Sequence, residues 1–281
     1  MKIKITADST CDLSGELVSI YDIEITPLYI IKDGKAYKDM KEIAPRDIFD
    51  HVSNGGAITS TSAVNVDDYI KYFTPLSRKH DAVIHLDISA DFSSCYQNAC
   101  TAAKEFDNVY VVDTRNLSTG SGLLVLEAAE MAERGVSPEK IVQTLNDLTS
   151  KVEASFVIDK LDYLQKGGRC SALAALGANL LSLRPCIEVK DGKMGVGKKY
   201  RGTFEKCIMQ YVRERLEGRG DINPKRIFIT HPPFEYHGLV DEVRKEIKKY
   251  VQFDDIIETH AGCTVSSHCG PGTLGILFMR K

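Results

Sequence analysis

Hydrophobic and polar positions in the first half of the chain form short runs of two kinds. Four runs with alternating or continuous apolar residues predict β-strands: "KIKITADS", "IEITPLYII", "DAVIHLDIS" and "NVYVVDT". Two further runs predict helices. "GLLVLEAAEMAERG" is rich in helix formers and ends at Gly135, and "SPEKIVQTLNDLTSKV" begins with Ser137 as N-cap and Pro138 at the first helical position. Strands that alternate with helices predict α/β layering with mostly parallel strands.

The pattern after about residue 150 is richer in strands. Five runs predict strands: "ASFVIDKLDYL", "PCIEVKDGKMGVGKKY", "KRIFITH", "DDIIETH" and "TLGILFM". Helices are expected at "TFEKCIMQYVRERLEG" and "GLVDEVRKEIKKYV", where Leu239, Val243 and Ile247 recur every four residues as one apolar stripe. We therefore expect two closely packed α/β domains, residues 1–150 and 151–281, with a ligand between or beside them.

Composition limits the classes of function. The 281 residues include 36 Lys+Arg and 39 Asp+Glu, a net charge of −3, which predicts no strong attraction to nucleic acid. The run "LAALGANLLSL" is too short to span a bilayer, and "MKIKITADST" has no apolar signal-peptide core, so a cytoplasmic location is expected. The eight cysteines include no CxxC pair and are expected to be buried thiols.

The segment "GKMGVGK" has the GxxxxGK spacing of a phosphate-binding loop, from Gly192 to Lys198. Position 199 is Lys, however, where such a loop needs Ser or Thr to hold Mg²⁺. The surrounding runs are both β-type and meet at Asp191-Gly192, which predicts a hairpin and not a strand-to-helix turn. Nucleotide binding is therefore not expected here.

Several polar segments follow predicted strands, at the edge where open α/β sheets bind ligands. "TADSTCDL" places Asp8 and Ser9 after the first strand, and "VVDTRNLSTGSGLLV" forms a Gly-rich helix start that could attract an anion but lacks the full GxGxxG. The clusters "TSTSAVN" and "DISADFSSCYQNA" offer hydroxyl donors but no GxSxG elbow. Each of these segments could equally provide only caps and turns.

Two segments near the end combine basic or imidazole groups with glycine. "KKYRGTFEK" carries Arg201, whose guanidinium can bind a carboxylate with two prongs or belong to a solvated face. "SSHCGPGTLG" carries His268 before Gly-Pro-Gly and is expected to be a shaped loop that leads into the last strand. The nearby His and Cys residues match no common zinc spacing, so no metal is expected.

The order of these segments resembles the DegV family of bacterial fatty-acid-binding proteins along nearly the whole chain. Family segments D-S-x-x-D-L, T-S-x-P-S, L-S-G-T-Y-Q and V-D-S match positions starting at Asp8, Thr61, Phe92 and Val112. The most specific matches are "LDYLQKGGR", "LRPCIEVKDGK", "YRG" and "SSHCGPGTLGI". The chain departs from the family pattern at Val64, Asn65, Ser94, Cys95 and Arg184.

This resemblance implies an N-terminal three-layer domain with a parallel sheet and a C-terminal domain with a mixed sheet. It also implies a long-chain fatty acid in an apolar tunnel. The protein would not itself be an enzyme. It would be a carrier that presents the fatty acid carboxylate to a separate ATP-dependent fatty acid kinase subunit, which forms an acyl phosphate for phospholipid synthesis. No cofactor or metal is implied, nucleic acid is not a partner, and contact with a membrane would be transient.

Matched family positions give the expected ligand-binding residues. Thr61, Ser62 and Ser93 are expected to donate to the carboxylate, and Arg201 and His268 to supply charge or further donors. Secondary candidates are Asp8, Ser9, Gly167, Gly168 and Arg169. His268 is expected to be a hydrogen-bonding group and not a general base, because a carrier has nothing to deprotonate.

Two other classes of function remain open on the residues alone. One is a self-sufficient hydrolase or phosphotransferase on a small carboxylate or ester, which would use Ser93 or the Gly-rich helix start. The other is a lipid-binding regulator that has no kinase partner.

For the carrier, burial of about fifteen methylenes at about 0.8 kcal/mol each contributes roughly 12 kcal/mol before the costs of immobilisation, so the acyl chain would dominate affinity.

Overall fold

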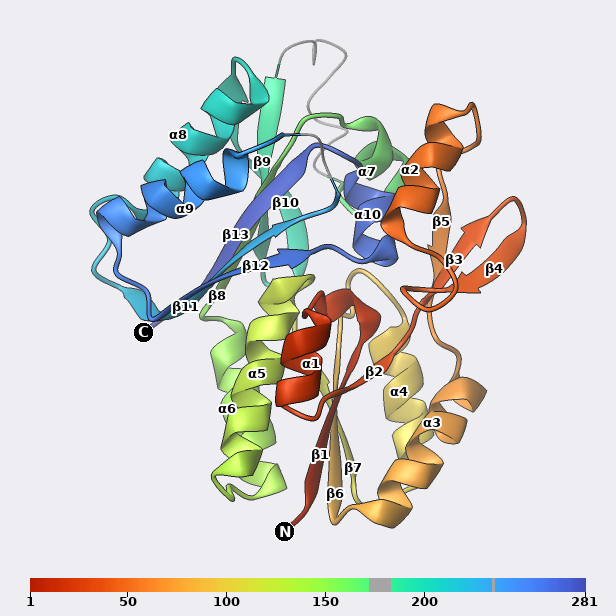
Figure 1. The fold of residues 1–281 in the computed structure, drawn as a ribbon. Helices are drawn as coiled ribbons and strands as arrows, with labels where there is room; N and C mark the ends of the chain where they lie inside the picture. The colour runs from red at the N-terminus through yellow and green to blue at the C-terminus, as the bar shows by residue number, and fades with distance from the viewer. Residues whose placement is uncertain (172–182, 234–235) are drawn as a thin grey trace.

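The computed structural model describes residues 1–171, 183–233 and 236–281 (Figure 1). In this part of the chain the strands form a four-stranded, a six-stranded and a three-stranded sheet. The apolar run at 173–182 lies outside the described residues. Among the described residues, no helix is both long enough and apolar enough to cross a bilayer.

The N-terminal half is built on a parallel sheet in the order β2-β1-β6-β7. Its strands are β1 (Ile3–Asp8), β2 (Glu24–Thr26), β6 (Ala82–Asp87) and β7 (Val109–Asp113). The helices around it are α1 (Gly15–Ile20), α3 (Val66–Lys79), α4 (Cys95–Ala103), α5 (Thr119–Glu133) and α6 (Pro138–Thr149). Figure 1 shows α3 and α4 on one face of the sheet and α5 and α6 on the other. The expected parallel α/β layering is confirmed.

A small antiparallel sheet projects from this half in the order β4-β3-β5. It consists of β3 (Tyr29–Lys32), β4 (Lys35–Lys38) and β5 (Ser60–Ser62), with α2 (Pro45–Ser53) beside it. The sequence prediction of one strand over "IEITPLYII" is wrong, because β2 ends at Thr26 and β3 starts at Tyr29. Pro27 lies between them and has no N–H for a ladder, so the chain leaves one sheet there and enters the other.

The C-terminal half is built on a mixed sheet in the order β10-β9-β8-β13-β11-β12. Its strands are β8 (Val152–Ile158), β9 (Leu183–Lys190), β10 (Lys193–Arg201), β11 (Ile222–His231), β12 (Asp255–His260) and β13 (Thr273–Arg280). Only the β11–β12 pair among these described strands is parallel. The β9–β10 hairpin turns at Asp191 and Gly192, whose positive φ angles of 50° and 81° are those a tight hairpin turn requires, so the rejected phosphate loop is indeed a hairpin.

Helices α8 (Phe204–Leu216) and α9 (Leu239–Tyr250) cover one face of this sheet. The predicted stripe Leu239, Val243 and Ile247 is buried there. The other face packs toward α5, so that one apolar core runs from the parallel sheet to Phe156 and Leu277 of the mixed sheet. The division at residue 150 stays a prediction; it falls between α6 and β8.

Two short helices replace the end of a predicted strand and part of a predicted loop. The run "ASFVIDKLDYL" is a strand only as far as Ile158, and Asp162–Gly167 form α7. His268 lies on α10 (Cys263–Cys269) and not in a loop; the loop is confined to Gly270–Gly272, where both glycines have φ of 74°. Both corrections have one cause, because a helix of six or seven residues is too short to show apolar periodicity.

Candidate ligand-binding site

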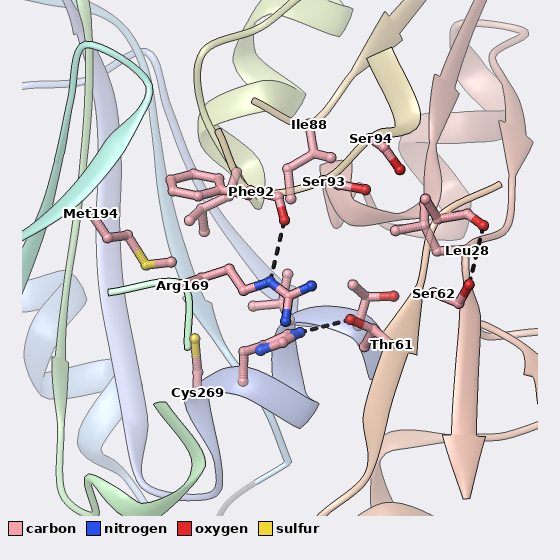
Figure 2. Close-up of a pocket in the computed structure, with 15 residues that line it drawn as sticks. Leu28, Thr61, Ser62, Ile88, Phe92, Ser93, Ser94, Arg169, Met194 and Cys269 are labelled. Carbon is pink, nitrogen blue, oxygen red and sulfur yellow. Dashed lines mark hydrogen bonds between the residues drawn. The ribbon is translucent and has the colours of Figure 1, made fainter. Parts of the chain in front are cut away.

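A cavity of about 120 Å³ lies where α10, β5, the start of α4 and the segment after α7 meet (Figure 2). Most of its surface is apolar, from Leu28, Ala63, Ile88, Phe92, Leu117, Met194, Val265 and Cys269. Polar groups gather on the remaining wall, from Thr61, Ser62, Ser93, Ser94, Arg169, Thr264 and His268. The cavity therefore joins an apolar surface to hydroxyl, imidazole and guanidinium groups.

Thr61 and His268 form a hydrogen-bonded pair in the wall of the cavity. His268 Nε2 lies 2.8 Å from Thr61 Oγ1, although the two residues come from β5 and from the last turn of α10. Burial and then the charge of Arg169 lower the pKa of His268 from 6.5 to about 4. The imidazole is therefore neutral at neutral pH and contributes hydrogen bonding but no charge.

Position 167 needs glycine because its backbone lies against the His268 imidazole. A Cβ at this position would lie 2.2 Å from His268 Nδ1, closer than any side chain can approach. Gly168 ends α7 with a φ of 68°, the left-handed conformation that glycine adopts at helix ends. The two glycines of "KGGR" therefore have structural roles that place Arg169 beside His268.

Arg169 supplies the positive charge of the cavity. Its Nε donates to the Phe92 carbonyl at 3.3 Å and its Nη1 donates to the Gly167 carbonyl at 2.8 Å. Figure 2 shows its guanidinium extending into the space between Ser93 and Thr61. Among the described lining residues, it is the one permanently charged side chain. Neither of these two bonds uses the Nη2 group.

The serines of the cavity are weakly engaged within the protein. Ser93 Oγ donates to Cys95 Sγ at 3.2 Å and accepts from Cys95 N–H at 3.3 Å, at the start of α4. Ser62 Oγ reaches the Ala63 carbonyl at 3.5 Å, at the limit for a hydrogen bond. Both hydroxyls can therefore turn toward a bound polar group at small cost.

Arg201, an expected head-group residue, lies outside this set of lining residues. It ends β10, opposite Leu183, and is exposed. The structure therefore brings together Thr61, Ser62, Ser93 and His268, with Arg169 as the guanidinium. In the sequence Arg169 and Arg201 look alike, because each stands next to a glycine. The packing of α7 against α10 is what places Arg169, and not Arg201, at the cavity.

Asp8 and Ser9 lie behind the wall and do not line the cavity. Ser9 Oγ accepts from the N–H of Leu28 at 3.1 Å, and Asp8 Oδ2 accepts from the N–H of Ile88 at 2.8 Å. The two donors, Leu28 and Ile88, are lining residues. These two side chains therefore hold the apolar wall in place.

Asp87 forms a buried polar cluster with Asp8, as sequence reasoning did not anticipate. Tyr69 donates to Asp87 Oδ1 at 2.7 Å, and His85 Nε2 lies 3.2 Å from the same oxygen. Asp8 and Asp87 each offer an oxygen within 4.8 Å of the other's and of Cys95 Sγ. Burial and the charge of Asp87 raise the pKa of Asp8 from 3.8 to about 6.

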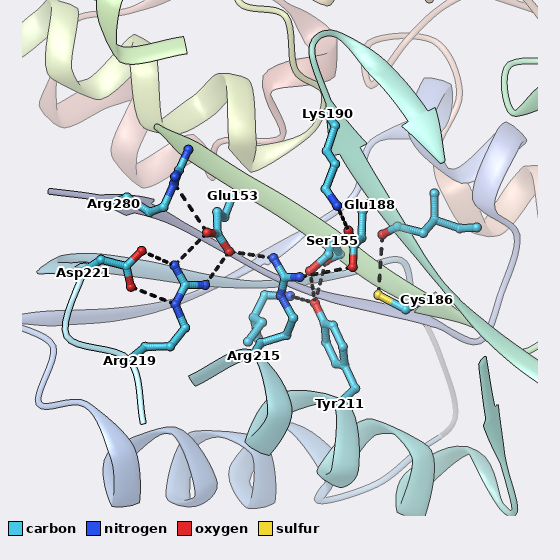
Figure 3. A network of polar contacts seen from close by, with 12 residues as sticks. Glu153, Ser155, Cys186, Glu188, Lys190, Tyr211, Arg215, Arg219, Asp221 and Arg280 are labelled. Carbon is cyan, nitrogen blue, oxygen red and sulfur yellow. Dashed lines mark hydrogen bonds and ion pairs between the residues drawn. The ribbon is translucent and has the colours of Figure 1, made fainter. Parts of the chain in front are cut away.

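A second cleft, of about 1030 Å³, has a different character. Three of the four arginines that line it are paired with a carboxylate: Glu153 receives bonds from Arg215 at 2.6 Å and Arg219 at 2.8 Å, and Arg280 lies 3.5 Å away (Figure 3). The fourth, Arg115, donates to the Asp191 carbonyl at 2.7 Å. Arg219 also binds Asp221. Charges that are already paired attract a further anion weakly, so the smaller cavity is the better candidate site.

Comparison with known proteins supports the expected relationship. Residues 2–281 match the family model described as "Uncharacterised protein, DegV family". A fatty acid-binding protein of Thermotoga maritima is 32% identical, over 98% of this chain and 96% of that protein. A Thermus thermophilus DegV structure described as binding fatty acid has a TM-score of 0.89 and 31% identity over 100% of both chains. A DegV lipid-binding protein of Thermotoga maritima has a TM-score of 0.87 and 30% identity, over 100% of this chain and 99% of that one. The chain belongs to the DegV family.

Proposed function

We propose that this protein binds a long-chain fatty acid and presents its carboxylate to a separate ATP-dependent kinase subunit. The main observation in support is that a single cavity combines an apolar wall with the guanidinium of Arg169 and the hydroxyls of Thr61 and Ser93. A fatty acid needs both parts, because its chain gains from leaving water while its carboxylate needs donors to replace its hydration. The fatty-acid-binding relatives from Thermotoga and Thermus support this assignment.

The head-group site works through one charge and several neutral donors. His268 Nδ1 is buried without a hydrogen-bond partner, and an unpaired buried acceptor is more common than an unpaired N–H. We therefore place the imidazole proton on Nε2, from which it donates to Thr61 Oγ1. The Thr61 hydroxyl then keeps its own proton for the fatty acid carboxylate. Ser62 and Ser93 add donors, and Arg169 supplies the compensating charge.

The acyl chain extends along the apolar wall. A second, smaller apolar cavity shares Leu117, Val265 and Cys269 with the first. We propose that the chain passes these three side chains away from the head-group site. Burial raises the pKa of the Cys269 thiol to about 12, so this residue serves as an apolar surface and not as a nucleophile.

The residues around the cavity favour a carrier over a self-sufficient enzyme. The described lining residues include no Asp or Glu, the usual Mg²⁺ ligands for ATP, which is why the kinase activity is assigned to another subunit. A hydrolase would need a base on Ser93, but that hydroxyl donates to Cys95 and the nearby imidazole pairs with Thr61. The kinase is cytoplasmic in this proposal, and contact with a membrane is limited to exchange of the fatty acid.

The test begins with the ligand that the protein retains. The protein is purified without detergent, extracted with organic solvent and analysed by mass spectrometry, and we expect about one C14–C18 fatty acid per chain. Turnover of an ester or of ATP by the isolated protein would contradict the proposal. Addition of a fatty acid kinase subunit and ATP should then give acyl phosphate; a bound fatty acid without that product would instead support the lipid-binding regulator.

A further inference from the structure

The N-terminus of α10 is held by two buried carboxylates from the other half of the molecule. Asp12 Oδ1 accepts from the N–H of Gly262 at 2.8 Å. Asp39 accepts from the N–H of Cys263 at 2.8 Å, and from the N–H and the hydroxyl of Thr264 at 3.2 and 2.6 Å. Both carboxylates are buried, with 6% and 1% of their residue surface exposed.

Neither carboxylate has a cationic partner among the described residues. Their remaining donors are hydroxyls: Ser118 donates to Asp12 at 2.6 Å and Ser9 donates to Asp39 at 2.8 Å. A buried carboxylate without a cation is costly unless several donors surround it. Burial raises the pKa of the Asp12 carboxyl from 3.8 to about 8, so this group holds the helix through its hydrogen bonds and not through a full charge. The N–H groups at the start of α10 and the two carboxyl groups therefore satisfy one another, and these hydrogen bonds fix the start of α10.

The other end of the same helix carries the head-group site. Ser267 bonds Thr59 at 2.8 Å and His268 bonds Thr61 at 2.8 Å, so each end of α10 is attached to the N-terminal half. A helix of seven residues is about 10 Å long, and a shift at its start moves its last turn as well.

We infer that Asp12 and Asp39 are positioning residues that set where α10 places His268 relative to Thr61 and Arg169. This inference rests on the proposed function, because the site they position is the proposed carboxylate site. Asp39 is the more informative of the two. An asparagine there could accept on its oxygen only, and its NH₂ group would face one of the N–H or O–H donors of Cys263, Thr264 or Ser9.

The experiment compares Asp39→Asn with the wild-type protein by two measurements. The first is NMR titration of the His268 imidazole without ligand; its pKa of about 4 should rise by one unit or more when the ring becomes exposed to water. The second is palmitate affinity, which should fall about tenfold or more. Glu139→Gln is the matched control, because Glu139 is an exposed first-turn carboxylate of α6. It should change neither measurement.

Ser9→Ala is a milder variant that removes one donor to Asp39 and keeps the carboxylate. It also removes the acceptor of the Leu28 N–H at the cavity wall, so the His268 titration is its decisive measurement. If Asp39→Asn does not fold, Ser9→Ala decides, and it should shift both measurements in the same direction by less. Unchanged His268 titration and unchanged palmitate affinity in the folded variants would overturn the inference. A wild-type protein that binds no palmitate would overturn the proposed function instead, and the ligand-free titration would still test the positioning.

Discussion

His268 Nε2 lies 2.8 Å from Thr61 Oγ1, so the last helix of the chain is bonded to a short strand 207 residues earlier. The bond crosses from the C-terminal half to the small antiparallel sheet, and the cavity lies beside it. It also sets the direction of the Thr61 proton, because a neutral imidazole that donates to Thr61 Oγ1 leaves the hydroxyl proton for a ligand.

Thr61→Val removes the hydroxyl and keeps the shape of the side chain. The carboxylate would lose a donor, and the Nε2–H of His268 would lose its acceptor, which costs about 1–3 kcal/mol. We expect palmitate affinity, measured by calorimetry, to fall about 5- to 150-fold. Thr144→Val is the control, since the exposed Thr144 hydroxyl bonds only within α6, to the Lys140 carbonyl. Equal affinity in both variants would contradict the role of Thr61.

Arg169→Met should weaken palmitate binding about tenfold or more, because it removes the charge that compensates the carboxylate. The same variant should bind the uncharged hexadecanol about as well as the wild-type protein, since that ligand needs no compensating charge. Competition of each ligand against a fluorescent fatty acid measures both affinities.

Arg201→Met tests which of the two expected arginines, Arg169 or Arg201, contributes to fatty acid binding. Arg201 ends β10 and lies outside the lining residues, so we expect this variant to keep the wild-type affinity for palmitate. A loss as large as that of Arg169→Met would move the head-group site toward β10 and contradict the assignment to Arg169.

Local signals in the sequence predicted much of the fold. Ser137 caps α6 as expected, and Asp191-Gly192 forms the predicted hairpin, because each signal depends on a few neighbouring residues. The split of "IEITPLYII" at Pro27 could have been read from the proline, whose missing N–H disfavours a continuous central strand.

The site was predictable only in part. The positions of Thr61, Ser93 and His268 came from matched family motifs, and all three line one cavity. The cavity's guanidinium and its distal apolar residues depend on contacts far apart in the sequence. Met194, for instance, reaches the cavity from β10 through the packing of a hairpin, and no residue near it in the sequence indicates that placement.

Gly167→Ala should displace the imidazole, because the new Cβ would lie 2.2 Å from His268 Nδ1. Overpacking of this kind costs about 1–3 kcal/mol, and we expect both a lower free energy of unfolding and weaker palmitate binding. Gly220→Ala is the matched control, because a Cβ at Gly220 would meet nothing within 4 Å. Wild-type binding by Gly167→Ala would show that the ring can move without harm to the site.

Val265→Phe tests the proposed path of the acyl chain. Val265 lines both apolar cavities, so a larger side chain there would occupy space where the proposed path of the chain runs from one cavity to the other. We expect palmitate affinity to fall while decanoate affinity changes little, because the shorter chain ends before the obstruction. An equal loss for both ligands would indicate that Val265 contacts the head group, and no loss for either would place the chain elsewhere.

The buried Asp8 carboxyl should give the protein a specific dependence of stability on pH. Burial and the charge of Asp87 raise the pKa of Asp8 from 3.8 to about 6, so the folded state holds the proton more tightly than the unfolded state. The resulting stabilisation is complete below about pH 4 and is lost as pH rises through 6, a decrease of about 3 kcal/mol from this group.

His268 acts in the opposite direction over an overlapping range. Because its folded pKa is lowered to about 4 from 6.5, its contribution is present above pH 6.5 and is lost as pH falls toward 4. Because the two contributions overlap, the wild-type protein alone does not separate them. The free energy of unfolding in urea is therefore measured at pH 4, 5, 6 and 7 for the wild-type protein and for a variant of Asp8. Relative to the wild-type protein, Asp8→Asn should gain stability as pH rises from 4 to 6, on top of a constant loss from the weakened bonds to Thr10 and Ile88. A difference between the two proteins that is independent of pH would show that folding does not raise the pKa of Asp8.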